Sequence, residues 1–153
     1  MTVLGRSGLK VSTLCLGTMT FGGRTDDKEA DRIYSRAREA GVNFFDTADV
    51  YNGGASEEVL GRLIRNERSH VVVATKLGNA MGEDPTHRGL SRRWMMEAVS
   101  ASLRRLDTDH IDILYLHKED PLTPLQETVR ALEDLVRSGK VRYLGVSSHK
   151  AWR

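Results

Sequence analysis

Short apolar runs alternate with helix-like patterns along the whole chain, and this alternation limits the folds that the sequence can adopt. The expected strands are residues 13–17, 43–46, 71–75, 111–116 and 141–146. A helical pattern separates each strand from the next, at a repeat of roughly thirty to forty residues. Parallel strands joined by right-handed helical crossovers satisfy this order. The sequence therefore predicts an α/β protein with a parallel sheet.

Residues that begin and end helices support the boundaries in the first half of the chain. Asp26 is predicted to cap a helix, with Glu29 three residues later, and Gly41 is predicted to end it. Ser56 is predicted to cap a second helix, whose positive end suits Glu57. These signals place one helix after each of the first two strands of the sheet.

Similar signals occur in the second half and at the N-terminus. Ser91 is predicted to cap a helix that reaches Leu106. Residues 123–126 read as a capping box with proline at the first helical position, and the helix that follows is predicted to end at Gly139. A Gly-Arg-Ser-Gly turn between short apolar runs predicts a β-hairpin over residues 3–11.

Length and charge exclude several classes of protein. A chain of 153 residues has room for one domain, residues 1–153. Its 23 basic and 21 acidic residues nearly balance, and no block of like charge marks a nucleic-acid-binding arm. The single cysteine, Cys15, favours a reducing compartment. The first ten residues lack a signal peptide's apolar core, and no run approaches the roughly 18 apolar residues of a membrane span. We therefore expect a cytoplasmic protein that binds neither nucleic acid nor membrane.

Two parallel architectures fit the strand–helix order, an open doubly wound sheet and a TIM barrel. Polar residues follow strands two to five in turn, as expected for loops that converge on one mouth of a barrel. An open sheet usually has a glycine-rich turn that opens a helix directly after its first strand. The corresponding turn, residues 17–23, lacks the G-x-G-x-x-G spacing and runs on to Asp26 before any helix begins. The barrel type is therefore favoured.

Four polar residues at the ends of the expected strands have complementary chemistry: Asp46, Tyr51, Lys76 and His117. A tyrosine hydroxyl ordinarily titrates near pH 10, too high to exchange protons readily near neutrality. A neighbouring ammonium favours the phenolate, and a carboxylate paired with that ammonium keeps it charged and oriented. An imidazole adds a donor that can polarise a carbonyl or relay its proton. Together the four residues predict an acid–base site that protonates a carbonyl oxygen.

The motifs that contain these residues resemble the aldo-keto reductase family. They are residues 41–63, Ala74-Thr75-Lys76, Leu116-His117 and residues 139–147, and they span essentially the whole chain. The resemblance implies an eight-stranded barrel, of which this sequence supplies about five strands, the N-terminal half. It also implies reduction of an aldehyde or ketone, a small-molecule carbonyl substrate, by NADPH.

The resemblance assigns a role to each site residue. Tyr51 is implied to be the general acid, with Lys76 and Asp46 as its tuning partners and His117 as the substrate-orienting group. The implied cofactor-binding residues are Gly17, Thr18, Met19, Asp46, Ser147 and Ser148. Ser147 matches the serine that holds the nicotinamide carboxamide. Ser148 stands where the family usually has asparagine, and it lacks the amide that would both donate to and accept from the carboxamide.

Alternatives to catalysis stay open at this point. The chain could be a non-catalytic half-barrel, either a fragment or an interaction module that has lost cofactor binding. It could also be a cofactor-sensing regulatory subunit of the same fold, although His117 argues against that reading. Asp49 is interpreted as a loop-capping residue. No metal is expected, because the other histidines share no metal-ligand spacing. The open edges of a five-strand arc predict a homodimer that forms through those edges.

Overall fold

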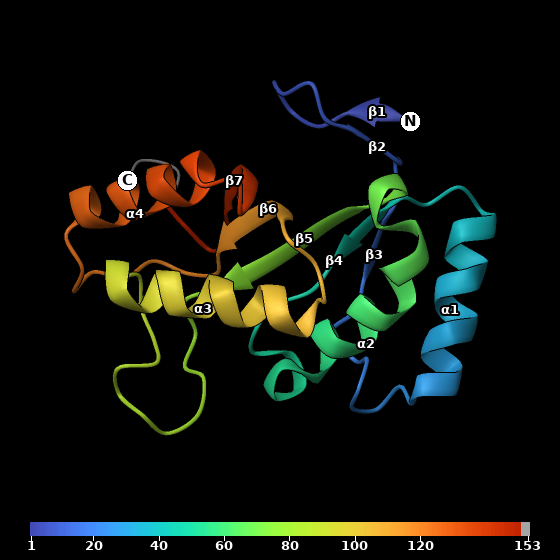
Figure 1. Cartoon of the computed structure of the whole chain (residues 1–153), viewed down its shortest axis with the longest axis horizontal. Helices are drawn as coiled ribbons and strands as arrows, with labels where there is room; N and C mark the ends of the chain where they lie inside the picture. Colours follow the sequence, from blue (N-terminus) through green and yellow to red (C-terminus); the bar gives the residue numbers. More distant parts are fainter. Residues whose placement is uncertain (151–153) are drawn as a thin grey trace.

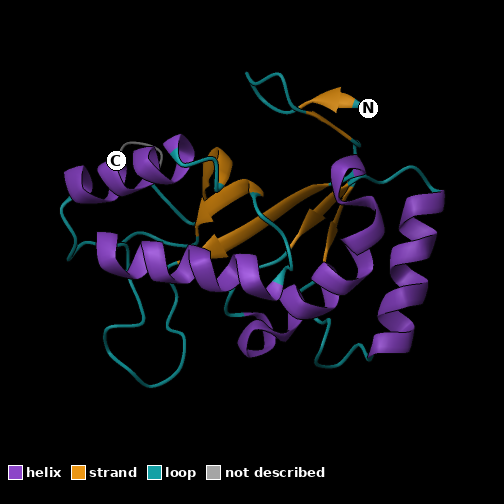
Figure 2. Cartoon of the chain, in the orientation of Figure 1, coloured by secondary structure: helices purple, strands orange, loops and turns teal. Residues whose placement is uncertain are grey.

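The computed structural model describes residues 1–150 of the chain. Its strands and helices alternate along the sequence as the apolar pattern predicts (Figures 1 and 2). The strands are β1 (Thr2–Val3), β2 (Lys10–Val11), β3 (Cys15–Gly17), β4 (Phe44–Asp46), β5 (Val72–Leu77), β6 (Ile111–Leu116) and β7 (Val141–Val146). The helices are α1 (Asp27–Glu39), η1 (Tyr51–Gly54), α2 (Ala55–Ile64), η2 (Arg65–His70), α3 (Arg92–Arg105) and α4 (Leu125–Arg137), with η1 and η2 of the 3-10 type.

Strands β3 to β7 form one sheet in which each strand pairs in parallel with the next along the chain. One α-helix lies in each connection, so the sheet grows in one direction and its order never reverses. This is the strand order of a TIM barrel, whereas a doubly wound sheet reverses at its switch point. Strands β1 and β2 form a separate antiparallel hairpin. The predicted class, a five-stranded part of a parallel barrel with an N-terminal hairpin, is confirmed.

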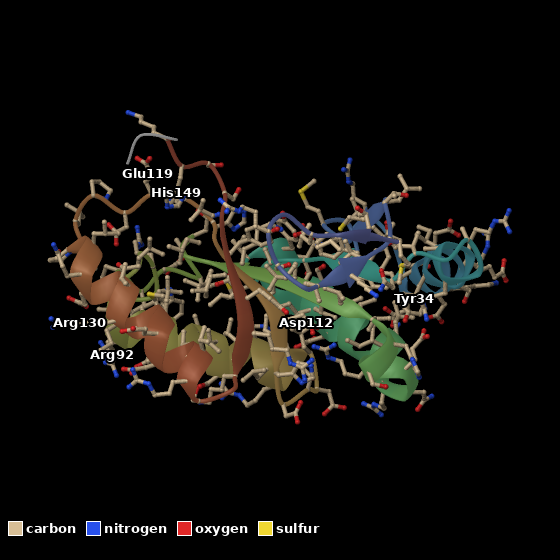
Figure 3. The ribbon with its side chains drawn as sticks, turned by 90° about the horizontal axis from the view of Figure 1, so that it is seen from above. Tyr34, Arg92, Asp112, Glu119, Arg130 and His149 are labelled. Carbon is tan, nitrogen blue, oxygen red and sulfur yellow. The ribbon has the colours of Figure 1, made fainter. Side chains whose placement is uncertain are left out.

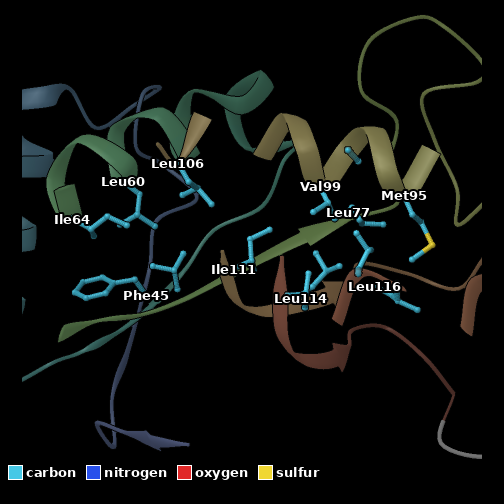
Figure 4. Packing of buried hydrophobic residues seen from close by; sticks show 14 of the residues in the cluster. Phe45, Leu60, Ile64, Leu77, Met95, Val99, Leu106, Ile111, Leu114 and Leu116 are labelled. Carbon is cyan, nitrogen blue, oxygen red and sulfur yellow. The ribbon is translucent and has the colours of Figure 1, made fainter. Parts of the chain in front are cut away.

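Both faces of the five-stranded sheet carry buried side chains, which pack against different parts of the chain. On the helix-covered face, Phe45 and Leu114 pack in one large cluster with Leu60 of α2 and Val99 of α3 (Figure 4). The opposite face carries a smaller cluster, formed by Val11, Val72, Ala74 and Ile113. Val11 belongs to the hairpin, so the hairpin packs against this face at β5 and β6. Each fully buried aliphatic side chain of this size contributes about 1.5–3 kcal/mol through removal of its surface from water.

The first half of the chain confirms one predicted helix start and corrects another. Asp26 caps α1 as predicted, because its Oδ1 accepts a hydrogen bond from the Glu29 backbone N–H at 2.8 Å. Ser56 does not cap α2. The N-cap is Gly54, two residues earlier, whose φ of 101° favours glycine over any residue with a side chain. Glu57 lies in the first turn of α2, at the positive end as predicted, and it is fully buried.

In the second half of the chain, one predicted helix cap is also confirmed and another is wrong. Ser91 caps α3 as predicted, since its Oγ accepts from the Trp94 backbone N–H at 3.3 Å. The capping box predicted over residues 123–126 is wrong, because Pro124 itself occupies the N-cap position of α4. The Thr123 hydroxyl donates instead to Asp120 Oδ2 at 2.7 Å. Across residues 1–150, no helix combines the length and apolar character that a membrane crossing needs.

Candidate active site

The order of the sheet brings the four predicted acid–base residues together at the carboxyl ends of its strands. Asp46 is the last residue of β4, Lys76 lies near the end of β5, and His117 directly follows β6. Strands β4, β5 and β6 are consecutive neighbours, and the carboxyl ends of parallel strands meet at the same edge. Tyr51 begins η1 in the connection after β4. Strand β5 extends two residues beyond its expected end, so Lys76 is held by the sheet itself.

Lys76 is the centre of this group. Lys76 is only 8% exposed, and its ammonium forms an ion pair with Asp46 Oδ1. Nζ also donates to the Thr47 carbonyl at 2.7 Å and to the Tyr51 hydroxyl at 3.3 Å. It lies 4.9 Å from the centroid of the Tyr51 ring. The ammonium therefore bridges a carboxylate and a phenol, which is the arrangement that proton donation by tyrosine requires.

The backbone after Tyr51 is fixed by a residue that the sequence reasoning missed. Asn52 has a φ of 51°, and its Nδ2 donates to the carbonyls of Met19 at 2.9 Å and Phe21 at 2.8 Å. These bonds tie the loop from Asp46 to Gly54, called the Tyr51 loop below, to the loop that follows β3. The signal was present as Asn52-Gly53-Gly54, because asparagine and glycine are the residues that adopt left-handed backbone most readily.

His117 faces the tyrosine from the end of β6. The two rings are 5.9 Å apart, centroid to centroid, and meet edge to face at 84°. The His117 backbone N–H donates to the Leu77 carbonyl at 2.9 Å, which fixes its position at the end of β6. Nδ1 is buried without a hydrogen-bond partner among residues 1–150. Burial lowers the pKa of His117, and the charge of Lys76 lowers it further, so the imidazole is neutral at pH 7.

The predicted cofactor turn after β3 is divided between exposed and buried residues. Gly17 is exposed, with no atom within 4 Å of the place that a Cβ would occupy, and Met19 is 57% exposed. Thr18 is fully buried, and its hydroxyl donates to the Asp46 carbonyl at 3.1 Å and contacts the Ser56 hydroxyl at 2.9 Å. The side chain of Thr18 thus holds the turn against β4, and a ligand would meet Gly17 and Met19.

The two predicted cofactor serines follow β7. The Ser147 N–H donates to the Leu116 carbonyl at 2.9 Å, and its hydroxyl makes no hydrogen bond within the described part of the chain. Ser148 is exposed and has a φ of 53°. Asparagine tolerates this left-handed backbone better than serine, which gives the family's preference at this position a conformational reason.

The loops after β6 and β7 meet beside these serines. The Lys150 N–H donates to Glu119 Oε1 at 2.6 Å, and Nδ1 of His149 lies 2.6 Å from the Ser147 carbonyl oxygen. Figure 3 shows Glu119 and His149 close together at one end of the molecule. On the helical side, Arg92 at the start of α3 pairs with Asp134 of α4 at 2.6 Å. The contacts of His149 and Lys150 fix the loop that carries both serines.

A buried group of charged residues under the Tyr51 loop is a second feature that the sequence did not reveal. Glu57 Oε1 accepts from the Thr75 hydroxyl at 2.5 Å, and its Oε2 pairs with Arg105 Nε at 2.7 Å. Asp49 is also fully buried, and neither of its carboxylate oxygens has a hydrogen-bond partner in residues 1–150. The loop-capping interpretation of Asp49 is therefore wrong. In the same residues, no three His, Cys, Asp or Glu side chains gather as metal ligands would.

Comparisons with known proteins agree with this geometry. A probable voltage-gated potassium channel subunit beta from Arabidopsis thaliana is 47% identical over 152 residues, which is 97% of this chain and 46% of the relative. The protein of the same description from Oryza sativa subsp. japonica is 46% identical over 152 residues, with the same coverage. The chain thus spans about half the length of these curated relatives.

A solved structure and a family model point the same way. The holo form of aldo-keto reductase AKR11C1 from Bacillus halodurans superposes with a TM-score of 0.86 at 41% identity, covering 95% of this chain and 49% of that one. The model of the aldo/keto reductase family matches residues 13–153. By its sequence, its strand order and the arrangement of its polar residues, this chain belongs to the aldo/keto reductase family.

Proposed function

We propose that this chain carries the acid–base site of an NADPH-dependent reductase that converts an aldehyde or ketone to an alcohol. The observation that carries the proposal is the position of Lys76 Nζ, which contacts Asp46 and the Tyr51 hydroxyl together. Family membership supports an oxidoreductase, and the neighbouring holo structure supports use of a nicotinamide cofactor.

Each residue of the site has a role that follows from its surroundings. Tyr51 gives its hydroxyl proton to the carbonyl oxygen of the substrate, and Lys76 stabilises the phenolate that remains. Asp46 and the Thr47 carbonyl hold the Lys76 ammonium in place. Because His117 is neutral at pH 7, it donates a hydrogen bond to the substrate without adding a second positive charge beside Lys76.

The residues around the site fit a nicotinamide. When bound, a reduced nicotinamide supplies the hydride that reaches the carbonyl carbon. Gly17 leaves room for a flat ring at the end of β3, because it has no side chain and no other atom lies within 4 Å of the position that a Cβ would occupy. The Ser147 hydroxyl, which makes no hydrogen bond among residues 1–150, can hold the carboxamide. NADPH is proposed over NADH on the family resemblance. The single cysteine, Cys15, supports a proposed cytoplasmic location.

The test is NADPH consumption in the presence of 4-nitrobenzaldehyde, followed by nicotinamide absorbance in the full-length protein. We expect turnover that falls at least about 10²-fold in Lys76→Met, because the variant cannot stabilise the Tyr51 phenolate. Lys28→Met is the matched control, since Lys28 is exposed on α1, and it should keep the parent rate. NADH in place of NADPH tests cofactor choice. Equal rates in Lys76→Met and the parent would overturn the proposed role.

A second candidate function is that of a potassium-channel auxiliary subunit, which the descriptions of the two plant relatives favour. Such a subunit would bind NADPH as a regulatory ligand and would not need to turn over. Quenching of NADPH fluorescence without consumption of 4-nitrobenzaldehyde would support this function over the reductase. The absence of both signals would favour the non-catalytic half-barrel.

A further inference from the structure

Asp49 is a buried carboxyl group to which the proposed mechanism gives no role. It lies in the connection between β4 and α2 and has no exposed surface. Neither oxygen has a hydrogen-bond partner among the described residues. An ionised carboxylate in such a place is disfavoured, because burial removes its water, and the nearby cations Arg105 and Lys76 offset that loss only in part. The protonated form is far easier to accommodate.

The charges that face Asp49 point to the same conclusion. Charged groups from three elements act on its carboxyl group: Glu57 of α2, Arg105 of α3 and Lys76 of β5. Arg105 is already paired with Glu57, and Lys76 is already paired with Asp46. Three carboxyl groups therefore share two cations. Ionisation of Asp49 would leave one negative charge without a partner, next to the fully buried Glu57.

Asp49 and Tyr51 lie in one loop that backbone hydrogen bonds hold in place. Its backbone N–H donates to the Lys76 carbonyl at 3.1 Å, and the Tyr51 N–H donates to the Ala48 carbonyl at 3.2 Å. The loop ends at Gly54, where a Cβ would lie only 2.7 Å from Cδ of Arg105. The loop thus rests on the same arginine that pairs with Glu57. Repulsion between Asp49 and Glu57 would move this loop, and Tyr51 with it, relative to Lys76.

We propose that Asp49 is a positioning residue whose uncharged form holds the loop from Asp46 to Gly54 so that Tyr51 lies beside Lys76, and whose ionisation displaces that loop. Its importance for turnover depends on the proposed role of Tyr51 as proton donor. Burial, and then the charge of Glu57, raise the pKa of Asp49 to about 7. The displacement therefore falls within the physiological pH range.

The first test is the pH dependence of stability, which needs neither substrate nor cofactor. Between about pH 4 and about pH 7 the folded chain keeps a proton on Asp49 that the unfolded chain has lost, so this residue's contribution to stability falls as the pH rises. We expect the melting temperature of Asp49→Asn, which stays neutral, to fall less than that of the parent as the pH rises over this range. Glu58→Gln removes an exposed carboxylate from the first turn of α2 and should keep the full decline. Identical declines in Asp49→Asn and the parent would overturn the proposal.

The second test follows Tyr51 directly by carbon NMR of the chain labelled at aspartate carboxyl and tyrosine ring carbons. We expect one aspartate to titrate near pH 7 and the Tyr51 resonance, assigned with Tyr51→Phe, to shift at the same midpoint. In Asp49→Asn both changes should vanish, and in Glu58→Gln both should remain. If Asp49→Asn does not fold, the parent decides: different midpoints, or titration of every aspartate below about pH 5, would overturn the proposal. Neither measurement requires turnover. The role of Asp49 can therefore be confirmed or overturned even if the proposed reductase function fails.

Discussion

A largely buried ammonium is stable only where its three donors are satisfied, and Lys76 satisfies them with Asp46, the Thr47 carbonyl and Tyr51. Because the same three contacts orient Tyr51, the cost of burying the lysine and the geometry of the acid–base site are not independent. Removal of Asp46 would leave the ammonium without its counter-charge. The sheet fixes this arrangement, since β4 and β5 are direct neighbours.

His117 provides a pH-dependent test at the scale of one residue. Burial, aided by Lys76, lowers its folded-state pKa below the ordinary value of about 6.5. Below about pH 6.5 the unfolded chain therefore binds more protons than the folded chain, and the contribution of His117 to stability is lost as the pH falls through its folded-state pKa. We expect His117→Gln, which cannot be protonated, to lose less thermal stability than the parent between about pH 7 and about pH 5.

Thermal melts at the two pH values check this expectation. His70→Gln is the control, because His70 is exposed. A loss of stability in His117→Gln equal to that of the parent would show that His117 does not resist protonation in the folded chain.

At the scale of elements, the packing of α2 on the end of α3 depends on one glycine. A Cβ at Gly61 would lie 2.6 Å from the Leu106 carbonyl oxygen and 2.8 Å from that of Arg105. Alanine is favoured over glycine in a helix interior by about 0.8–1.0 kcal/mol. Overpacking against a backbone that cannot move typically costs about 1–3 kcal/mol. We expect the clash to outweigh helix propensity, so that Gly61→Ala lowers the free energy of unfolding.

Urea denaturation measures this change. Gly8→Ala is the control, since no atom lies within 4 Å of a Cβ at that position. An increase in stability in Gly61→Ala would mean that α2 and α3 are less closely packed than the structure shows. The result also bears on the site, because α2 directly follows the Tyr51 loop.

The strands were the most predictable elements, and helix starts the least. Strands β6 and β7 have the predicted bounds, because continuous or alternating burial is visible in the sequence. The start of α2 was missed because a glycine with positive φ replaces the side-chain cap. The burial of Glu57 was missed because its partner, Arg105, lies 48 positions away in the sequence. Such long-range pairing leaves no local signal.

The candidate site was predictable to the extent that parallel strands place their ends together. That rule correctly brought Asp46, Lys76 and His117 to one edge without knowledge of any side-chain contact. It could not show that Asn52 anchors the Tyr51 loop or that Asp49 is buried beneath it. Those features depend on how the loops fold over the sheet, which the strand pattern does not specify.

At the scale of the whole molecule, the sheet has two outer edges. Within residues 1–150, β3 and β7 each pair with one strand. Leu144 and Val146 of β7 are 46% and 60% exposed, and Leu14 beside β3 is 69% exposed. Unpaired strand edges with apolar side chains recruit other strands. We propose that two copies of this chain associate through these edges as a two-fold dimer.

Light scattering after size exclusion tests the dimer. A lysine on an edge strand opposes pairing, so Leu144→Lys should shift a dimer of twice 17.1 kDa toward monomer. Leu122→Lys is the matched control, because Leu122 is a 91% exposed leucine outside the sheet. A monodisperse parent of 17.1 kDa at tens of micromolar would rule the dimer out.

The most direct test of the central claim is the rate of NADPH-dependent reduction of 4-nitrobenzaldehyde in Tyr51→Phe. This change removes the proton donor and keeps the ring beside Lys76. Turnover should fall about 10²–10⁴-fold, as is typical when a general acid is lost, with NADPH affinity nearly unchanged. Tyr143→Phe, which alters a half-buried tyrosine of β7, should keep the parent rate. If Tyr51→Phe kept more than about half of the parent rate, Tyr51 would not be the proton donor.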